Sequence, residues 1–422
     1  MNIKELYHVF LHSAGVNTDT RTIREGQLFV ALKGENFDGN AFALQALEAG
    51  AVRAVVNDTV EADDPRLVKV PDTLAALQQL AAYHRQQFDI PVIGLTGTNG
   101  KTTTKELIRA VLGAKYSVTA TEGNLNNDLG VPLSVLKINA DTQIAIIEMG
   151  ASHPEDLKPL LAVAQPTHGL ITNVGKAHLL GFGSFEGVKH AKGLLYDYLK
   201  EHEGVAFANA DDPVLQEMLW DREMTRIPYG MEGVELLPAS ADEPFVRLRF
   251  ADGYVLNTHL VGAYNALNML AALKIGWLFG VPESDARAAV EAYEPSNNRS
   301  QLMKTGCNTV IVDAYNANPS SMAVALDNLA LNSGRKVALL GDMRELGADS
   351  AAEHRKIVER LQGLEAFLVG EEFTRAAAGT GIRTFATSDD LAAWLRENPL
   401  QGCTVLVKGS RGTRMEKVIP SL

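Results

Sequence analysis

The chain has 422 residues, of which 46% are hydrophobic and 21% are charged, a balance typical of globular proteins that excludes a disordered or low-complexity chain. Its 51 acidic and 39 basic side chains give a net charge of -12, which argues against general DNA or RNA binding because that requires a basic surface. At about 150 residues per domain, the length predicts roughly three domains.

Redox and targeting signals favour a cytoplasmic protein. Only two cysteines occur, Cys307 and Cys403, so a disulfide framework is not expected. The first residues lack the basic and apolar regions of a secretory signal peptide. No apolar run approaches the roughly 20 residues of a membrane-spanning helix, and we therefore expect no membrane span.

Short apolar runs rich in β-branched residues alternate with helical patterns, which predicts an α/β fold with parallel sheets. In the first domain, residues 1–85, we expect strands at 27–32 and 51–56 with a helix at 41–49 between them. The segment 73–87 has helical periodicity and is expected to connect this domain to the second.

The alternation of strands and helices continues in a second domain, residues 86–297, and restarts in a third, residues 298–422. Strands of the second domain are expected at 90–95, 143–148, 167–173 and 204–208. Strands of the third are expected at 310–313, 336–341, 366–370 and 403–407. The stretch 228–258 does not fit the alternation, and we interpret it as a small antiparallel insertion.

The strongest local signal is the segment 97–103, GTNGKTT, which follows an apolar strand and opens a helix. Small residues let backbone N–H groups close around phosphate oxygens, and the helix N-terminus adds partial positive charge. Lys101 would reach the terminal phosphates, and the hydroxyl of Thr102 would bind Mg²⁺. Leu95 stands where the strict pattern has glycine, but the strand–loop–helix context still predicts a nucleoside triphosphate site.

Two residues farther along the chain, Glu148 and His178, are candidates for a metal site, whereas nothing in its spacing distinguishes Lys192. Glu148 ends an apolar strand, where P-loop proteins place a metal-binding carboxylate, although a solvated glutamate is an equally good interpretation. His178 lies just beyond another strand, at the edge where α/β sites gather, yet a lone histidine is more often structural. Lys192 has the pattern of an ordinary lysine on a helix surface.

Taken together, the motifs resemble those of the Mur ligases, the enzymes that build the peptidoglycan stem peptide. The resemblance rests on ordered segments along nearly the whole chain, namely DTR at 19–21, FVALKG at 29–34, GTNGKTT at 97–103, GNLNNDLGVP at 123–132, DAYNANP at 313–319, LGDMRELG at 340–347 and KGSRG at 408–412. Several of these segments are similar to those of the branch that adds D-alanyl-D-alanine.

The resemblance implies an architecture and a reaction. The three domains would be an N-terminal UDP-substrate domain, a central P-loop ATPase and a Rossmann-like C-terminal domain. ATP would phosphorylate the carboxylate of a UDP-N-acetylmuramoyl-tripeptide, and the amine of D-alanyl-D-alanine would attack the acyl phosphate to form the pentapeptide precursor. This order is chemically sound because a carboxylate acylates an amine only after its oxygen becomes a good leaving group. A monomer is expected.

The resemblance also implies roles for individual residues around ATP. The phosphate loop would comprise Gly97, Thr98, Asn99, Gly100, Lys101, Thr102 and Thr103. The metal ligands would be Thr102, Glu148, His178 and Lys192. Lys192 would be carbamylated, because a carbamate turns a cation into an anionic oxygen ligand. Asn265 and Asn268 would meet the adenine, Asp313 the ribose, and Arg299 a phosphate.

The remaining implied residues concern the other two substrates. Those facing the UDP-muramoyl substrate would be Asn124, Asn126 and Asn127, with Thr20 and Arg21 at its nucleotide end. Asn316 and Asn318 would lie on the dipeptide side. Each asparagine by itself is more often a turn or cap residue.

Two classes of alternative remain. A sister ligase that adds a diamino acid, or a folylpolyglutamate synthetase, would share the ATP loop and the acyl phosphate, but the Asp-Asn-Pro-Arg tetrapeptide expected of the former does not occur. A nucleotide-dependent switch would need the P-loop without a second metal site, so Glu148, His178 and Lys192 together argue against it. Dependence of activity on carbon dioxide would separate a switch from a ligase.

Overall fold

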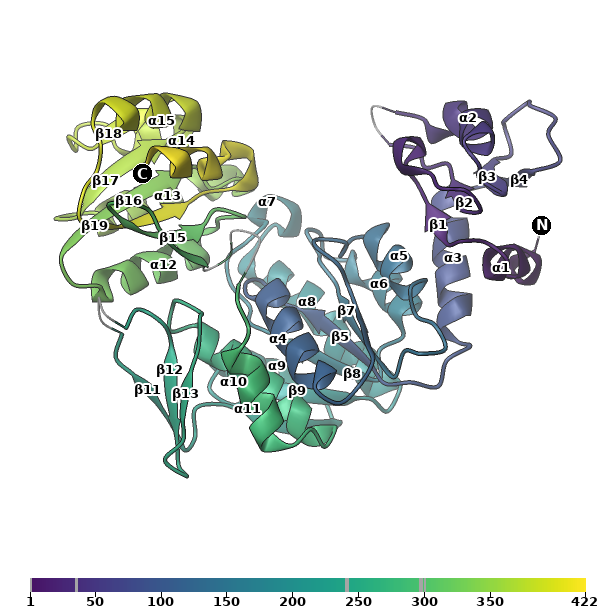
Figure 1. Cartoon of the computed structure of the whole chain (residues 1–422), viewed down its shortest axis with the longest axis horizontal. Coiled ribbons are helices and arrows are strands. Elements are labelled where there is room, and N and C mark those ends of the chain that lie inside the picture. Colours follow the sequence, from purple (N-terminus) through teal and green to yellow (C-terminus); the bar gives the residue numbers. More distant parts are fainter. Residues whose placement is uncertain (1, 35–36, 240–242, 296–298, 300) are drawn as a thin grey trace.

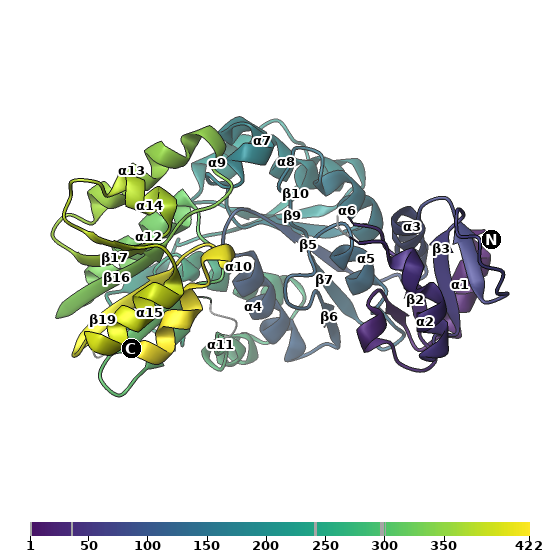
Figure 2. The same cartoon turned by 90° about the horizontal axis from the view of Figure 1, so that it is seen from above.

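The computed structural model describes residues 2–34, 37–239, 243–295, 299 and 301–422. Four sheets organise these residues, and the two termini lie at opposite ends of the molecule (Figures 1 and 2). The predicted boundary between residues 297 and 298 lies outside the described residues. No helix in the described ranges is both long and apolar enough to cross a membrane.

The N-terminal part contains a parallel sheet of order β1-β2-β3-β4. Its strands are β1 (Val16–Asn17), β2 (Leu28–Val30), β3 (Arg53–Asn57) and β4 (Leu67–Val70), and its helices are α1 (Ile3–Leu11), η1 (Thr20–Thr22), η2 (Gly39–Phe42), α2 (Ala43–Glu48) and α3 (Thr73–Arg85). The helix predicted at 41–49 thus begins as a 3₁₀ turn. Side chains of α1, α3 and the central-domain helix α5 belong to one continuous apolar core, so α3 connects the two domains as predicted.

The central domain has a six-stranded parallel sheet of order β10-β9-β8-β5-β7-β6. The strands are β5 (Val92–Thr96), β6 (Val118–Ala120), β7 (Ile144–Glu148), β8 (His168–Ile171), β9 (Val205–Asn209) and β10 (Thr225–Tyr229). The helices are α4 (Lys101–Gly113), α5 (Gly130–Val135), α6 (Leu157–Ala164), α7 (Leu179–Phe182), α8 (Phe185–Glu201), α9 (Pro213–Leu219), α10 (Asn265–Leu278) and α11 (Glu283–Glu291).

Both faces of the central sheet are covered, which is why its strands are apolar without alternation. Ile93 and Leu95 of β5 pack with α4 and α10 on one face, whereas Val92 packs in the core that contains α6 and α8 on the other. The insertion predicted at 228–258 is confirmed as an antiparallel sheet of β11 (Val234–Leu237), β12 (Arg247–Phe250) and β13 (Val255–Asn257).

The C-terminal domain has a six-stranded sheet of order β14-β15-β19-β16-β17-β18, parallel except for β14. Its strands are β14 (Gln301–Lys304), β15 (Thr309–Asp313), β16 (Arg335–Gly341), β17 (Glu365–Val369), β18 (Arg383–Phe385) and β19 (Cys403–Lys408). Its helices are α12 (Pro319–Leu331), η3 (Gly347–Asp349), α13 (Ser350–Arg360), α14 (Glu371–Ala376), α15 (Ser388–Glu397), η4 (Arg411–Thr413) and η5 (Met415–Ser421). The predicted α/β class is confirmed.

Candidate active site

The phosphate-binding loop joins β5 to α4 at the carboxyl edge of the central sheet, where ligands of open α/β sheets bind. Gly100 has φ +80°, a backbone conformation that glycine adopts without strain. Gly97 has φ +143°, and a Cβ atom there would lie 2.0 Å from Oγ1 of Thr172, so the loop needs glycine for close packing on the chain after β8.

The neighbouring strand holds the loop in shape. Asn173, after β8, accepts from the backbone N–H of Asn99 at 3.0 Å and donates to its carbonyl at 3.0 Å. Thr172 donates to the same carbonyl at 2.7 Å, and Thr98 donates to the carbonyl of Gly175 at 3.3 Å. The loop is therefore preorganised by polar contacts that are local to two adjacent strand ends.

Lys101 begins α4 and folds back over the loop. Its Nζ donates to the carbonyls of Gly97 at 2.7 Å and Thr98 at 3.1 Å. Burial lowers the pKa of Lys101, the carboxylate of Glu148 opposes that shift, and Arg299 adds to it. An anionic phosphate bound at the loop would offer a stronger partner to the ammonium group of Lys101, which now donates to the loop carbonyls.

Glu148 is 1% exposed, so the interpretation of a solvated glutamate is wrong. Its carboxylate accepts from the hydroxyl of Thr102 at 3.0 and 3.3 Å and from Nδ2 of Asn126 at 2.8 Å. A buried carboxylate beside a hydroxyl at the carboxyl edge of the sheet is a donor set that suits Mg²⁺, which prefers oxygen ligands. Among the described residues, no group of three or more His, Cys, Asp or Glu side chains is arranged to hold a metal ion.

Lys192 contradicts the expectation of a helix-surface lysine. Its side chain on α8 is 2% exposed, Nζ donates to the carbonyl of Ala151 at 3.2 Å and lies 5.4 Å from the ring centre of Phe182. Burial lowers the pKa of Lys192 well below its ordinary value, the charge of Lys101 lowers it further, and Asp156 opposes the shift. A lowered pKa keeps more of the amine in its neutral form, and the neutral amine is the nucleophile that reacts with carbon dioxide.

His178 precedes α7 and lines the same cavity as the phosphate loop. Its Nδ1 is in direct polar contact with the carboxylate of Glu345 from the C-terminal domain, although the ring N–H is not aligned as a hydrogen bond. His178 therefore lies where the central and C-terminal domains meet.

Most of the predicted residues converge on one cavity of about 990 Å³ between the central and C-terminal domains. Those that line it are Thr98, Asn99, Gly100, Lys101, Thr102, Thr103, Asn124, Asn126, Asn127, Glu148, His178, Asn265, Asn268, Arg299, Asp313, Asn316 and Asn318. Gly97 and Lys192 do not line it: Gly97 packs beneath the loop, and Lys192 is buried beside Ala151.

Two buried asparagines lie at the start of α10, next to the phosphate loop. Asn265 donates to the carbonyl of Val261 at 2.8 Å, and Asn268 donates to Oδ1 of Asn265 at 2.8 Å. A Cβ atom on Gly100 would lie 3.0 Å from Oδ1 of Asn268, so α10 and the loop are in close contact. These amides offer hydrogen-bonding groups at one end of the cavity.

The C-terminal domain supplies the opposite wall. Asp313 at the end of β15 and Lys408 at the end of β19 are paired in register, and their side chains form an ion pair of 2.5 Å. The guanidinium of Arg299 lies 3.6 Å from the ring centre of Tyr315. Asn318 donates to Oδ1 of Asn99 at 2.8 Å, which joins this wall directly to the phosphate loop.

Sequence reasoning assigned no role to several lining residues, including Lys408. Lys408 is 1% exposed and also donates to the carbonyl of Asn316 at 3.2 Å. A lysine directly after the apolar run 403–407 was the available signal. Other lining residues without an assigned role include Gln78, Asp128, Ser152, His153, Asp156 and Ser320, and nothing in their spacing distinguishes them from turn and cap residues.

Thr20 and Arg21 lie away from this cavity, in the η1 turn of the N-terminal sheet. Arg21 pairs with Asp19 at 2.6 Å, and hydrogen bonds from Arg21 lower the pKa of Asp19 to about 2. The structure therefore does not bring these two residues to the cavity, and any contact they make with a substrate lies outside it.

Models of one family match three consecutive stretches of the chain. They are described as the Mur ligase family catalytic domain, at residues 12–85, the Mur ligase middle domain, at 95–276, and the Mur ligase glutamate ligase domain, at 298–411. The order of these matches follows the order of the sheets along the chain.

Named relatives are similar over nearly the whole chain. A UDP-N-acetylmuramoyl-tripeptide–D-alanyl-D-alanine ligase of Bacillus subtilis is 36% identical, with 97% of this chain and 93% of that protein covered. The protein of the same name in Escherichia coli is 35% identical, with 96% and 93% covered.

Solved structures agree with the sequence relatives. MurF from Acinetobacter baumannii has a TM-score of 0.88 at 31% identity, with 100% of this chain and 98% of that chain covered. MurF ligase from Thermotoga maritima in complex with ADP has a TM-score of 0.87 at 28% identity, with 98% and 97% covered. With family models along most of its length and relatives above 30% identity over nearly all of it, the chain belongs to the Mur ligase family.

Proposed function

We propose that the chain is an ATP-dependent ligase that joins D-alanyl-D-alanine to UDP-N-acetylmuramoyl-tripeptide, forming the pentapeptide precursor of peptidoglycan. The observation that carries the proposal is the convergence of a P-loop lysine, a buried Thr102–Glu148 pair and a polar wall from a second domain on one cavity. Relatives that bear this activity in their names match 93% of their length to this chain.

ATP occupies the cavity with its phosphates on the 97–103 loop. Lys101 exchanges its loop carbonyls for the β- and γ-phosphates and stabilises the charge that develops between them. Asn265 and Asn268 meet the adenine, Asp313 the ribose and Arg299 a phosphate. Because Arg299 and Asp313 come from the far side of the cavity, their contacts form only when the two domains are together.

Thr102 and Glu148 would hold one Mg²⁺, and His178 with a carbamylated Lys192 would hold a second. Bound there, such ions would screen the phosphate charges and help to orient the γ-phosphate toward the substrate carboxylate. The buried amine of Lys192, with its pKa lowered chiefly by burial, supports the carbamate. Asn126, which donates to Glu148, keeps that carboxylate oriented.

The reaction proceeds in two displacements. A carboxylate oxygen of the tripeptide attacks the γ-phosphorus, ADP leaves, and an acyl phosphate forms. The amine of D-alanyl-D-alanine then adds to the acyl carbon, and the tetrahedral intermediate collapses to the amide as phosphate leaves and the nitrogen gives up a proton. Walls from two domains surround the cavity, which would limit the access of water to the acyl phosphate.

The remaining residues of the site bind the other substrates. Asn124, Asn126 and Asn127 face the UDP-muramoyl part, Asn316 and Asn318 lie on the dipeptide side, and Thr20 with Arg21 meets the nucleotide end. The proposal includes action as a monomer, no nucleic-acid partner, and the domain division 1–85, 86–297 and 298–422. It also includes a cytoplasmic location, which two free cysteines and the use of ATP support.

The test is phosphate release from ATP by the purified chain with Mg²⁺, UDP-N-acetylmuramoyl-tripeptide and D-alanyl-D-alanine, with each component omitted in turn. We expect release only when both substrates are present, with a product heavier than the tripeptide by the dipeptide less water. Release with a diamino acid and the shorter precursor would instead identify a sister ligase. Hydrolysis of ATP without either substrate would favour a nucleotide-dependent switch.

A further inference from the structure

A turn of the C-terminal domain, residues 342–347, reaches across to the central domain. At its tip, the carboxylate of Glu345 contacts Nδ1 of His178, and the carbonyl of Glu345 accepts from the backbone N–H of Leu180 at 3.2 Å. A Cβ atom on Gly347 would lie 3.2 Å from Cδ1 of Leu180, so the turn packs closely on α7. No residue of this turn has a role in the reaction proposed above.

Both partners of the contact have an unusual backbone. Glu345 has φ +65° and His178 has φ +51°, the left-handed conformation that residues other than glycine rarely adopt. Only five non-glycine residues in the described part of the chain have positive φ, and two of them are this pair. A strained backbone at both ends of one contact between domains indicates a functional constraint rather than a chance approach.

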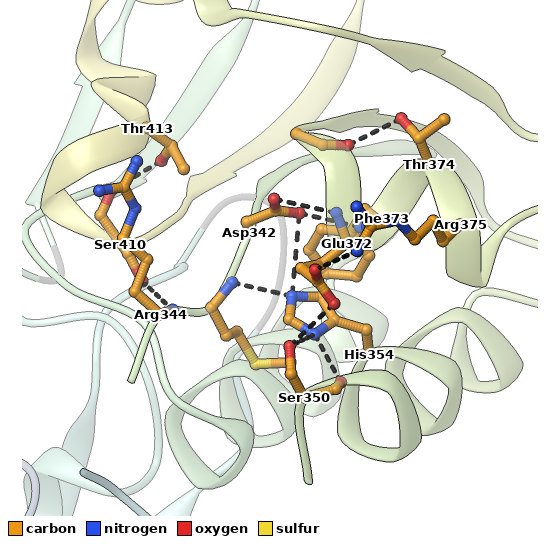
Figure 3. A network of polar contacts seen from close by, with 12 residues as sticks. Asp342, Arg344, Ser350, His354, Glu372, Phe373, Thr374, Arg375, Ser410 and Thr413 are labelled. Carbon is orange, nitrogen blue, oxygen red and sulfur yellow. Dashed lines mark hydrogen bonds and ion pairs between the residues drawn. The ribbon is translucent and has the colours of Figure 1, made fainter. Parts of the chain in front are cut away.

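The base of the turn is firmly anchored in the C-terminal domain (Figure 3). The carboxylate of Asp342 accepts from the backbone N–H groups of Glu372 at 3.1 Å and Phe373 at 2.9 Å, at the start of α14. A Cβ atom on Gly370 would lie 2.2 Å from the carboxylate of Asp342, so any larger residue at position 370 would displace that carboxylate.

The next two residues of the turn are held by their backbone N–H groups. Met343 donates to Nε2 of the buried His354 at 3.0 Å, and Nδ1 of His354 bonds to the carbonyl of Ser350 at 2.8 Å. Arg344 donates to Oγ of Ser410 at 2.9 Å. Three consecutive anchored residues therefore present Glu345 to the central domain in one position.

Stability alone does not explain the contact. The side chain of Glu345 is 59% exposed and that of His178 is 32% exposed, and polar pairs this open to solvent contribute little to folding. Although the ring N–H is not aligned as a hydrogen bond, the negative charge of a carboxylate beside Nδ1 favours the tautomer that carries its proton there. That tautomer leaves the lone pair of Nε2 free to act as a ligand.

We propose that Glu345 is a positioning residue of the ligase: from the C-terminal domain, it holds His178 in one ring orientation and one tautomer. His178 would then present Nε2 as a ligand only when the two domains are together. This inference rests on the proposed function, because it makes the contact between the two domains a part of how the active site is assembled.

The kinetic test compares Glu345→Ala and Glu345→Gln with the control Glu353→Ala. Glu353 comes from the same domain and also pairs across the boundary, with Nζ of Lys176 at 3.3 Å, but it does not touch His178. We expect Glu345→Ala to lower kcat about 10- to 100-fold, the usual effect of losing a partner that orients a ligand, with KM for ATP within about twofold. Glu345→Gln, which keeps an acceptor, should recover part of kcat, and Glu353→Ala should keep most of it.

The second readout does not depend on turnover. Nitrogen-15 spectra of histidine rings in the full chain, with Mg²⁺ and a non-hydrolysable ATP analogue, report the tautomer of His178, whose signals are those lost in His178→Gln. We expect the Nδ1–H form in the wild type and in Glu353→Ala, and its loss in Glu345→Ala.

An unchanged tautomer and kcat in Glu345→Ala, or an equal loss in Glu353→Ala, would overturn the positioning role. A wild-type chain that forms no pentapeptide would instead overturn the proposed function.

Discussion

The two walls of the cavity are built in different ways. The phosphate-binding part of the central wall is one continuous segment, the 97–103 loop, whose shape is set by its own glycines and by Asn173 of the adjacent strand end. The C-terminal wall gathers residues far apart in the chain, such as Asp313 and Lys408, which strand register brings into contact.

This difference predicts a difference in function. If ATP binds as proposed, groups of the 97–103 loop would contact the phosphates whatever the position of the C-terminal domain, so their loss should remove the chemistry. Groups of the C-terminal wall act only when the domains are together, so their loss should weaken binding in graded steps. The following variants test that contrast, beginning with the largest expected effect.

Lys101→Ala should lower ligation about a thousandfold or more, because a charge aimed at the transferred phosphate is lost from a buried site. The measurement is ATP-dependent phosphate release with both substrates present. Lys115→Ala is the matched control, since Lys115 follows the same helix and bonds to the carbonyl of Gly280 at 2.8 Å. Turnover like that of the wild type in Lys101→Ala would contradict the assignment of the loop.

Lys192→Ala should lower ligation about a hundredfold and be partly rescued by added short carboxylates such as formate, which would replace the oxygens of the proposed carbamate. Because burial lowers the pKa of Lys192, its amine stays neutral at a lower pH than an ordinary lysine. Bicarbonate should therefore restore activity of carbon-dioxide-depleted enzyme even near neutral pH.

The control for Lys192→Ala is Lys189→Ala on the same helix, where the lysine pairs with Glu217 at 2.7 Å. Full activity of Lys192→Ala without added carboxylate would rule out the carbamate. Mass spectrometry of the intact wild-type chain under bicarbonate gives an independent check of the modification.

Asn318→Ser tests the C-terminal wall. Asn318 caps α12 by accepting from the N–H of Ser321 at 2.8 Å and also donates to Asn99 at 2.8 Å. Serine keeps the cap but cannot reach the loop, so Tm should be unchanged while one hydrogen bond worth about 1 kcal/mol is lost. We expect KM to rise about fivefold for ATP, through the lost contact with the loop, and also for D-alanyl-D-alanine, on whose side Asn318 is proposed to lie, with little change in kcat. A fall in kcat as large as that of Lys192→Ala would break the contrast between the walls.

Arg21→Ala should have the smallest effect, because Arg21 lies outside the cavity and is exposed. We expect KM for the UDP-linked substrate to rise by about threefold, a typical effect of one exposed charged contact, with unchanged kcat. Arg66→Ala is a close control, since Arg66 pairs with Asp64 in the same geometry at 2.8 Å. Equal kinetics in the two variants would show that Arg21 does not contact the UDP-linked substrate.

The sequence by itself determined the features that depend on neighbouring residues. The phosphate loop is one of these, because an apolar strand, a glycine turn and a lysine at a helix start are encoded within about a dozen positions. The strands of the parallel sheets are another, since burial of both faces requires apolar runs. The antiparallel insertion was recognisable because its pattern differs from its surroundings.

Only the tertiary structure decided what depends on contacts across the chain. Lys192 has the local pattern of a surface lysine, and it is buried because α8 packs on the sheet with that side chain beside Ala151. Lys408 reaches Asp313 only through the register of β15 and β19. The contact of His178 with Glu345 requires two domains to meet. Burial and charge pairing arise from packing between distant segments, so a local pattern does not contain them.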